Sequence, residues 1–483
     1  MKRQFVKHGL VYGGANVISS MSSVLLVPIY THALPPSEYG VVDYLVAVQA
    51  LVQICAGLEI TQGIARFYAS AETDQQRQAY ASTGFWFLLA SCAGVCGVLY
   101  LAVRAGGGEF LGLGTASSLA GIALLSVYTR ILFYVLQSQA RWELRSDVYS
   151  LASVVAVSCT AAAVGYLLLV RHLGLAGVFW GLSIGYGLGC GFCLLSLRRT
   201  YRALFDPEKL RRMLRFSLPL VFSSLAIVFA SYGDRIILRS VLGFHDLGIY
   251  GIGARIAAVI TLVVNGFQLG AAPLIYRHYD EPATPAALAQ LMRLFLAVGL
   301  VGVVGLSAFS IELLRAFATP EYSAAWRVVP VLAFAIVLGS LYVFVPGLSI
   351  RNLTGRFALI SIATAAVSLV LVAVCVRLLG MVGASLGVLG GAAAGFALHA
   401  AFSQDVYPIP LEWRRLVGGL LITALTIAAS WLIGAPGAVS FVLRLLLFSV
   451  SSVLLVEVLS TRQERGVVQR AVVSGAMSRW SAA

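Results

Sequence analysis

Charged residues are scarce in this sequence of 483 residues. Asp, Glu, Lys and Arg together make up 11% of it, whereas hydrophobic residues make up 59%. Soluble domains are typically about 25% charged, so this composition excludes an ordinary soluble globular protein. Apolar runs of membrane-spanning length recur along the whole chain instead. We therefore expect an all-α polytopic membrane protein.

Side chains that bind metals or form disulfides are also few. The sequence has seven cysteines, and all of them fall within apolar runs. Cys190 and Cys193 have the spacing of a CxxC motif, but no His or carboxylate stands near them, so we interpret them as small helix residues. No phosphate-binding GxxxxGK[ST] motif occurs in the predicted cytoplasmic loops. We expect no metal, no cofactor, no ATPase and no enzymatic activity.

Fourteen apolar runs are long enough to span a membrane. They cover residues 9–32, 41–65, 81–103, 115–136, 148–170, 173–197, 216–238, 247–275, 291–314, 327–350, 356–376, 379–403, 416–433 and 437–459. With the N-terminus in the cytoplasm, every inside segment carries at least two Lys or Arg residues, and no outside segment carries more than two. This asymmetry predicts that both termini are cytoplasmic. It also explains the formal charge of +14 without a nucleic-acid partner.

The most basic inside segment divides the chain into two related halves. We predict an N-lobe of six helices at 1–197, a cytoplasmic linker helix at 198–215, a C-lobe of six helices at 216–403, and a further helix pair with a tail at 404–483. Asp206 followed by Pro207 is typical of a helix start, and Leu210, Met213 and Leu214 form an apolar face that suits the membrane surface.

The two halves align at an offset of 208 residues. Leu34 then matches Leu242, Glu38 matches Asp246 and Gly40 matches Gly248. A parallel repeat related by an axis along the membrane normal is a transporter arrangement in which the substrate binds between the lobes.

Several stretches resemble the polysaccharide and O-antigen flippases of the multidrug/oligosaccharidyl-lipid/polysaccharide (MOP) exporter superfamily. They are PIYTHALPPSEYGVVDY at 28–44, GIARFY at 63–68, SLPLVFSSL at 217–225, YGDRIIL at 232–238 and LGIYGIGARI at 247–256. The resemblance implies two six-helix lobes in a V shape that open alternately to either side of the bacterial inner membrane. It also implies an oligosaccharide substrate on an undecaprenyl pyrophosphate carrier.

The resemblance implies further partners and a branch of the superfamily. Partners would be membrane lipids, a coupling ion (Na⁺ or H⁺), and the polysaccharide polymerase and export machinery. Fourteen helices resemble the lipid II flippase branch, in which the extra pair forms an apolar groove for the lipid tail. Some polysaccharide flippases also have fourteen helices, so this number leaves the branch open.

Several polar side chains fall within the predicted spans, where a charge costs at least about 2.5–3.5 kcal/mol and usually faces a cavity or a partner. The candidates for a substrate-binding cavity are Asn16, Arg66, Arg130, Ser224, Ser231, Arg235 and Arg255. For Arg255 the alternative is a side chain that reaches the outer interface, and for Arg66 it is an ordinary positive-inside residue. The four arginines outnumber the carboxylates Glu59 and Asp234 in the predicted cavity region, and this excess of positive charge favours a pyrophosphate or an acidic sugar as substrate.

Three carboxylates, Asp43, Glu59 and Asp234, are candidates for gating or ion coupling. Glu59 and Arg66 are expected on one face of the second helix. Asp234 and Arg235 stand near the outer end of the seventh helix, where they would form an outer gate, a latch between the lobes or a local pair at the membrane interface.

Three alternatives to a flippase remain open. A cation-coupled multidrug antiporter of the same superfamily should have an acid-rich cavity. A membrane polysaccharide polymerase or glycosyltransferase should have sizeable outside loops, which this sequence lacks. A non-transporting assembly partner is compatible with the sequence.

Overall fold

The computed structural model describes residues 26–108, 117–268, 279–351, 353–433 and 437–460. Within these ranges the chain is helical and has no strand. The first lobe contains α2 (Val27–Ala33), α3 (Pro36–Gly57), α4 (Ile60–Ser70), α5 (Asp74–Arg104), α6 (Ser117–Trp142), α7 (Ser146–Gly165) and α8 (Gly174–Ser196). The second contains α9 (Pro207–Ala257), α11 (Thr284–Phe317), α12 (Val328–Gly339), α13 (Gly347–Ile350) and α14 (Thr354–Gln404), followed by the pair α15 (Trp413–Ile433) and α16 (Ala438–Leu459).

Eleven helices in the described part are long and apolar enough to cross a membrane. Two of them, α9 and α14, each contain two of the predicted runs. In each, the helix continues across a sharp bend that separates the two runs, at Gly243 (φ +85°) in α9 and at Gly380 (φ +61°) in α14. Positive φ is readily adopted only by glycine, so these residues permit the sharp bends. The spans therefore account for all predicted runs except the first, residues 9–32, which lies mostly outside the described residues.

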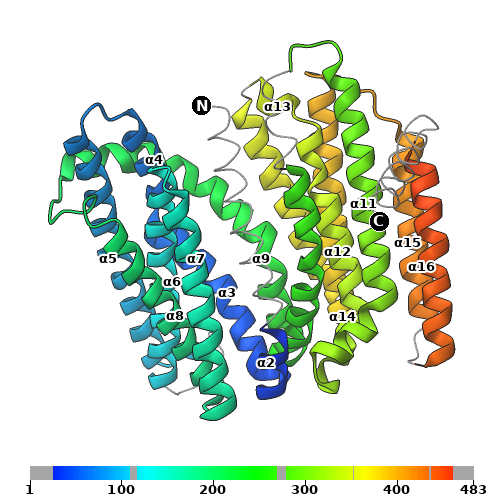
Figure 1. The fold of residues 1–483 in the computed structure, drawn as a ribbon, viewed down its shortest axis with the longest axis horizontal. Helices are drawn as coiled ribbons and strands as arrows, with labels where there is room; N and C mark the ends of the chain where they lie inside the picture. Colours follow the sequence, from blue (N-terminus) through cyan, green and yellow to red (C-terminus); the bar gives the residue numbers. More distant parts are fainter. Residues whose placement is uncertain (1–25, 109–116, 269–278, 352, 434–436, 461–483) are drawn as a thin grey trace, which may run out of the picture.

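The two lobes form a V and converge where α2, α3 and α9 meet, in the lower centre of Figure 1. Hydrogen bonds close this end: the Thr31 hydroxyl donates to the Phe317 carbonyl at 3.2 Å, and the Tyr322 hydroxyl donates to the Leu34 carbonyl at 2.9 Å. The loops at this end are those that the charge pattern predicts to lie outside.

Two glycines allow α3 and α9 to cross in close contact. A Cβ added to Gly40 would lie 1.9 Å from the Phe244 carbonyl oxygen, and a Cβ added to Gly248 would lie 1.9 Å from the Pro36 carbonyl oxygen. These two contacts are equivalent at the offset of 208 residues, which relates Pro36 to Phe244 as well as Gly40 to Gly248. The repeat predicted from the sequence is therefore visible as a contact between equivalent residues of the two lobes.

The second predicted span is not one continuous helix. It breaks between α3 and α4 at Leu58 (φ +46°) and Glu59 (φ +54°), two residues in the left-handed conformation. The prediction that Glu59 and Arg66 share a face of one helix is therefore wrong, because Leu58 and Glu59 change the direction of the chain before α4 begins.

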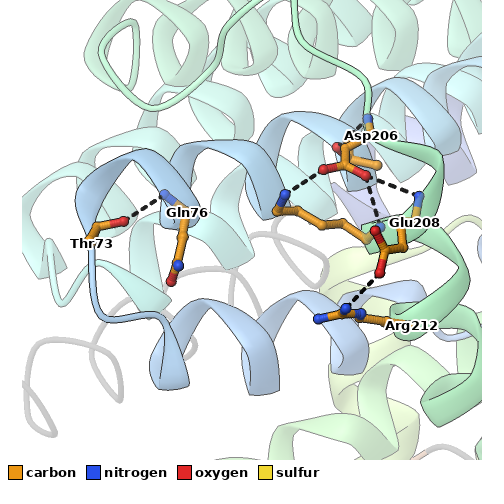
Figure 2. A network of polar contacts seen from close by, with 7 residues as sticks. Thr73, Gln76, Asp206, Glu208 and Arg212 are labelled. Carbon is orange, nitrogen blue, oxygen red and sulfur yellow. Dashed lines mark hydrogen bonds and ion pairs between the residues drawn. The ribbon is translucent and has the colours of Figure 1, made fainter.

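The linker becomes helical only at Pro207, and its helix continues into the seventh span without interruption. Figure 2 shows its start, where the Asp206 carboxylate accepts hydrogen bonds from the backbone N–H groups of Glu208 (3.0 Å) and Lys209 (3.1 Å), as the Asp-Pro signal predicted. The Asp206 N–H donates to the Thr83 hydroxyl of α5 at 3.1 Å. The predicted lobe boundary at residue 216 stays a prediction.

Part of the apolar face of the linker helix packs on α4. Met213 is fully buried, and a Cβ added to Gly63 of α4 would lie 3.0 Å from the Met213 Cβ. Leu210 and Leu214 of the same face are only half-buried, so α4 and α5 cover part of this face, and the interfacial helix stays a prediction.

Polar contacts attach the C-terminal pair to α11. Arg444 of α16 is 1% exposed and forms an ion pair with Glu312 at 2.7 Å. The hydroxyls of Ser307 and Ser430 lie 2.7 Å apart. At the opposite end, Arg293 pairs at 2.7 Å with Glu412, which directly precedes α15.

Candidate functional site

A cavity lies among α2, α3, α6 and α8 of the first lobe, where Arg255 of the second lobe joins its lining, and it is lined by two arginines. Arg130 comes from α6 of the first lobe, and Arg255 comes from the part of α9 that follows the Gly243 bend. The other lining residues are Tyr30, Val42, Leu45, Val46, Gln49, Ser126, Val127, Phe179 and Leu182. The cavity is small, with a volume of about 50 Å³, and it is partly open to solvent. No acidic residue lines it among the described residues, so its charge is positive.

Aromatic rings hold both guanidinium groups in place. The Arg255 guanidinium lies 5.1 Å from the Tyr30 ring centroid and 5.2 Å from that of Tyr39. The Arg130 guanidinium lies 5.5 Å from the ring of Tyr186 on α8. Cation–π contacts of this kind retain the charge while restricting its position. The sequence did not identify these tyrosines, because nothing separates them from the many other aromatic residues in the spans.

An ion cluster joins α3 to α9 next to this cavity. Arg235 Nε lies 3.1 Å from the carboxylate of Asp43, and Arg235 Nη1 lies 3.1 Å from that of Asp234. The Tyr250 hydroxyl donates to Asp234 at 2.5 Å. Asp43 directly follows Val42, a cavity residue, so the cluster lies close to the cavity.

The cluster bridges the two lobes, because Asp43 belongs to the first and Arg235 to the second. Asp43 and Asp234 are each 7% exposed and Arg235 is 15% exposed, so water screens their attraction only weakly. Two carboxylates share one guanidinium, and Arg255 on the same long helix faces Tyr39, one turn before Asp43 on α3. The sequence identified Asp43 and Arg235 separately and did not predict that they pair.

The remaining sequence candidates lie apart from the cavity residues. Arg66 is exposed on α4 and stacks on Phe216 of α9, with 4.3 Å between the guanidinium and the ring centroid. Ser231 is exposed, and its carbonyl accepts a hydrogen bond from Arg235 at 3.3 Å. Ser224 is half-buried on α9. Asn16 lies outside the described residues.

Glu59 lines a second, smaller cavity at the break between α3 and α4. Of the predicted residues, the structure therefore brings Arg130 and Arg255 into one cavity and Asp43, Asp234 and Arg235 into one cluster. Arg130 of the first lobe and Arg255 of the second can together bind an anionic group noncovalently in this cavity.

The sequence matches the profile of the family described as polysaccharide biosynthesis protein over residues 5–277. No curated protein sequence matches the chain significantly.

Solved membrane transporters share the fold. The lipid II flippase MurJ in an inward closed conformation gives a TM-score of 0.70 at 12% identity, over 96% of this chain and 100% of that one. An inward-facing multidrug resistance MATE family transporter of the MOP superfamily gives 0.66 at 14% identity, over 86% of this chain and 96% of that one. An outward-facing structure with the same description gives 0.57 at 14% identity, over 83% and 95%.

Proposed function

Because the chain belongs to the polysaccharide biosynthesis protein family, whose profile matches more than half of it, we propose that it is a lipid-linked oligosaccharide flippase. Its substrate would be a polysaccharide repeat unit on undecaprenyl pyrophosphate, moved from the inner to the outer leaflet of a bacterial cytoplasmic membrane. No bond in the substrate is broken in this activity. Both termini would lie in the cytoplasm.

The observation that carries the proposal is the pair of arginines that the two lobes contribute to one cavity. A guanidinium presents paired N–H donors that match phosphate oxygens, and its charge persists in a half-buried site. A pyrophosphate between Arg130 and Arg255 would contact both lobes at once. Gln49 and Ser126 offer neutral hydrogen-bonding groups to sugars on the same wall. The lipid tail would remain in the bilayer.

The contacts between the lobes support an inward-facing resting state. The α3–α9 crossing and the Asp43–Arg235 pair lie toward the end whose loops are predicted to be outside. The greater likeness to an inward-facing than to an outward-facing transporter agrees with this orientation. In the proposed cycle, the Asp43–Arg235 latch and the helix crossing separate when the outer side opens. A Na⁺ or H⁺ gradient would supply the energy.

Binding of a short-chain undecaprenyl-pyrophosphate disaccharide analogue to the purified protein tests this proposal. Arg130→Ala and Arg255→Ala should each weaken binding by about 10- to 100-fold, since a hydrogen bond to a charged group contributes about 1.5–3 kcal/mol. Arg77→Ala is the matched control, because Arg77 is exposed on α5 and outside the cavity. Unchanged binding by both cavity variants would contradict the proposal.

The same purified protein distinguishes the flippase from a multidrug antiporter, an alternative that the shared fold leaves open. An organic cation such as ethidium should not bind to a cavity that carries two arginines and no acidic residue among its described lining. Tight ethidium binding together with no binding of the lipid analogue would favour the antiporter.

A further inference from the structure

The loop that connects the two lobes, residues 197–206, is held in place on the first lobe. It lies between α8 and α9, and side chains of α5 bind its backbone. The Gln78 side chain donates a hydrogen bond to the Arg199 carbonyl at 2.9 Å. The Ser82 hydroxyl accepts a hydrogen bond from the Arg202 N–H at 2.9 Å. The backbone of this linker loop is therefore fixed against the predicted cytoplasmic end of α5.

The linker loop lies at the depth of the membrane interface. Trp86, near the start of the predicted span 81–103, is 39% exposed and donates its indole N–H to the Arg202 carbonyl at 2.9 Å. Tryptophan is enriched at the level of the lipid head groups. Leu195, in the last turn of α8 before the loop, is 76% exposed, as expected for a side chain that faces acyl chains. In Figure 1 the loop lies at the left edge of the first lobe, away from the second.

The exposed side chains of the linker loop are basic and apolar. Arg198, Arg199 and Arg202 are exposed, and within the described part of the chain none of them forms an ion pair. Leu204 is 43% exposed and Phe205 is 50% exposed. Large apolar side chains gain free energy when they leave water, and arginines are attracted to an anionic membrane surface. The loop therefore has both of the properties that bind a segment to such a surface.

The carboxylates beside the linker loop leave it with an excess of positive charge. Asp206 pairs with Lys209, and Glu208 pairs with Arg212 at 2.6 Å, a pair that Figure 2 shows. Each of these two carboxylates is therefore balanced by its own cation. Glu143, in the turn after α6, accepts a hydrogen bond from the hydroxyl of the loop threonine at 2.6 Å. One carboxylate against three arginines leaves the loop positively charged.

We propose that the linker loop is a binding site for a phospholipid with net negative charge, with phosphatidylglycerol as the expected lipid. The guanidinium groups of Arg198, Arg199 and Arg202 would bind the phosphate oxygens, which match their paired N–H donors. Leu204 and Phe205 would lie among the upper parts of the acyl chains. This inference goes beyond the proposed transport activity and does not depend on it.

The charge of the loop distinguishes between phospholipids. A zwitterionic head group carries an ammonium group that the arginines repel, whereas phosphatidylglycerol carries none. Each arginine near an anionic membrane surface strengthens the attraction about fivefold. An acidic soluble protein is a poorer fit, because the Trp86 contact places the backbone of Arg202 at the level of the head groups.

Fluorescence quenching by brominated lipids tests the site, because a tryptophan lies in it. The full-length chain with Trp86 as its single tryptophan is reconstituted in mixtures of phosphatidylcholine and phosphatidylglycerol, with bromine on the acyl chains of one of the two lipids. Quenching should show a preference of at least about fivefold for phosphatidylglycerol at Trp86. A chain with Trp180 as its single tryptophan is the control reporter, since Trp180 is 41% exposed near the other end of α8 and should show no such preference.

A double variant, Arg199→Gln with Arg202→Gln, should bind the two lipids about equally at Trp86. Both substitutions leave the backbone bonds to α5 in place. Arg104→Gln is the matched control, because Arg104 is exposed at the opposite end of α5 and should leave the preference unchanged. High salt should weaken the native preference.

Three results would overturn the proposal: equal quenching by both lipids in the native loop, an unchanged preference in the folded double variant, or the same preference at Trp180. Relief of quenching by inorganic phosphate in solution would also overturn it, since the site would then bind phosphate without a lipid. If the single-tryptophan chains do not fold, native mass spectrometry of the otherwise unaltered chain makes the same comparison. The double variant should then retain fewer phosphatidylglycerol molecules than the native protein, and equal retention would contradict the site.

Discussion

Replacing Gly40 with alanine should disturb the outer contact between the lobes. The new Cβ would lie 1.9 Å from the Phe244 carbonyl oxygen, and Cβ contacts below 3.0 Å essentially never occur, so the backbones must separate by about 1 Å. Forcing an extra methyl group into a packed interface costs about 1–3 kcal/mol. If the strain acts only when the outer side is closed, the equilibrium shifts about 5- to 150-fold toward the open conformation.

Spin labels at Leu173→Cys and Leu378→Cys, in a background without the seven native cysteines, report this shift. Leu173 directly precedes α8 and Leu378 lies beside the Gly380 bend of α14, and both are exposed at the end predicted to lie outside. Double electron–electron resonance should show a larger long-distance population in Gly40→Ala, and in the equivalent Gly248→Ala. Gly94→Ala is the control, because its added Cβ meets nothing within 4 Å. An unchanged distance distribution in both folded variants would refute the claim that this crossing closes the outer side.

Three further outcomes are expected. Asp43→Asn should also favour the conformation with an open outer side. It should have no further effect in an Arg235→Gln background, because the Asp43–Arg235 pair is already broken there. Equal effects in both backgrounds would contradict the Asp43–Arg235 latch. Arg444→Met should lower the free energy of unfolding by about 1–3 kcal/mol, since it leaves the half-buried Glu312 carboxylate without its partner. Glu312→Leu in the same chain should recover part of this loss, and thermal unfolding measures both. Asp206→Ala should cost about 0.5–2 kcal/mol. The hydrogen bond from Lys209 lowers the pKa of Asp206 below its usual value of 3.8. The stabilisation by the cap is therefore complete above pH 3.8 and is lost as the pH falls through the lowered pKa. An effect of Asp206→Ala that does not depend on pH would contradict this role of the ionised carboxylate.

The spans and the family were predictable from the sequence because both depend on local patterns. Hydropathy gives the length of a span directly, and the predicted last pair, 416–433 and 437–459, differs from α15 and α16 by at most three residues. The resemblance to polysaccharide flippases is confirmed by the family match and by the shared fold. The offset between the halves predicted the equivalence of Gly40 and Gly248, although not their contact.

The partners of the charged residues were not predictable in the same way. Asp43 and Arg235 are 192 positions apart and meet only because two helices cross at glycines. The break at Leu58 and Glu59 was also missed, because neither residue type signals a left-handed conformation and the hydropathy of the run continues through it. Long-range packing determines both features, and a single sequence does not specify it.

The most direct test of the flippase proposal is translocation in proteoliposomes that contain only this protein. A fluorescent undecaprenyl-pyrophosphate-linked oligosaccharide is incorporated in both leaflets, and dithionite reduces only the head groups that reach the outer leaflet. The native protein should make the inner-leaflet fraction reactive within the assay, whereas the Arg130→Ala and Arg255→Ala double variant should leave that fraction protected. Protection that is identical in native, double-variant and protein-free vesicles, with Na⁺ and H⁺ gradients applied in either direction, would contradict the proposed function.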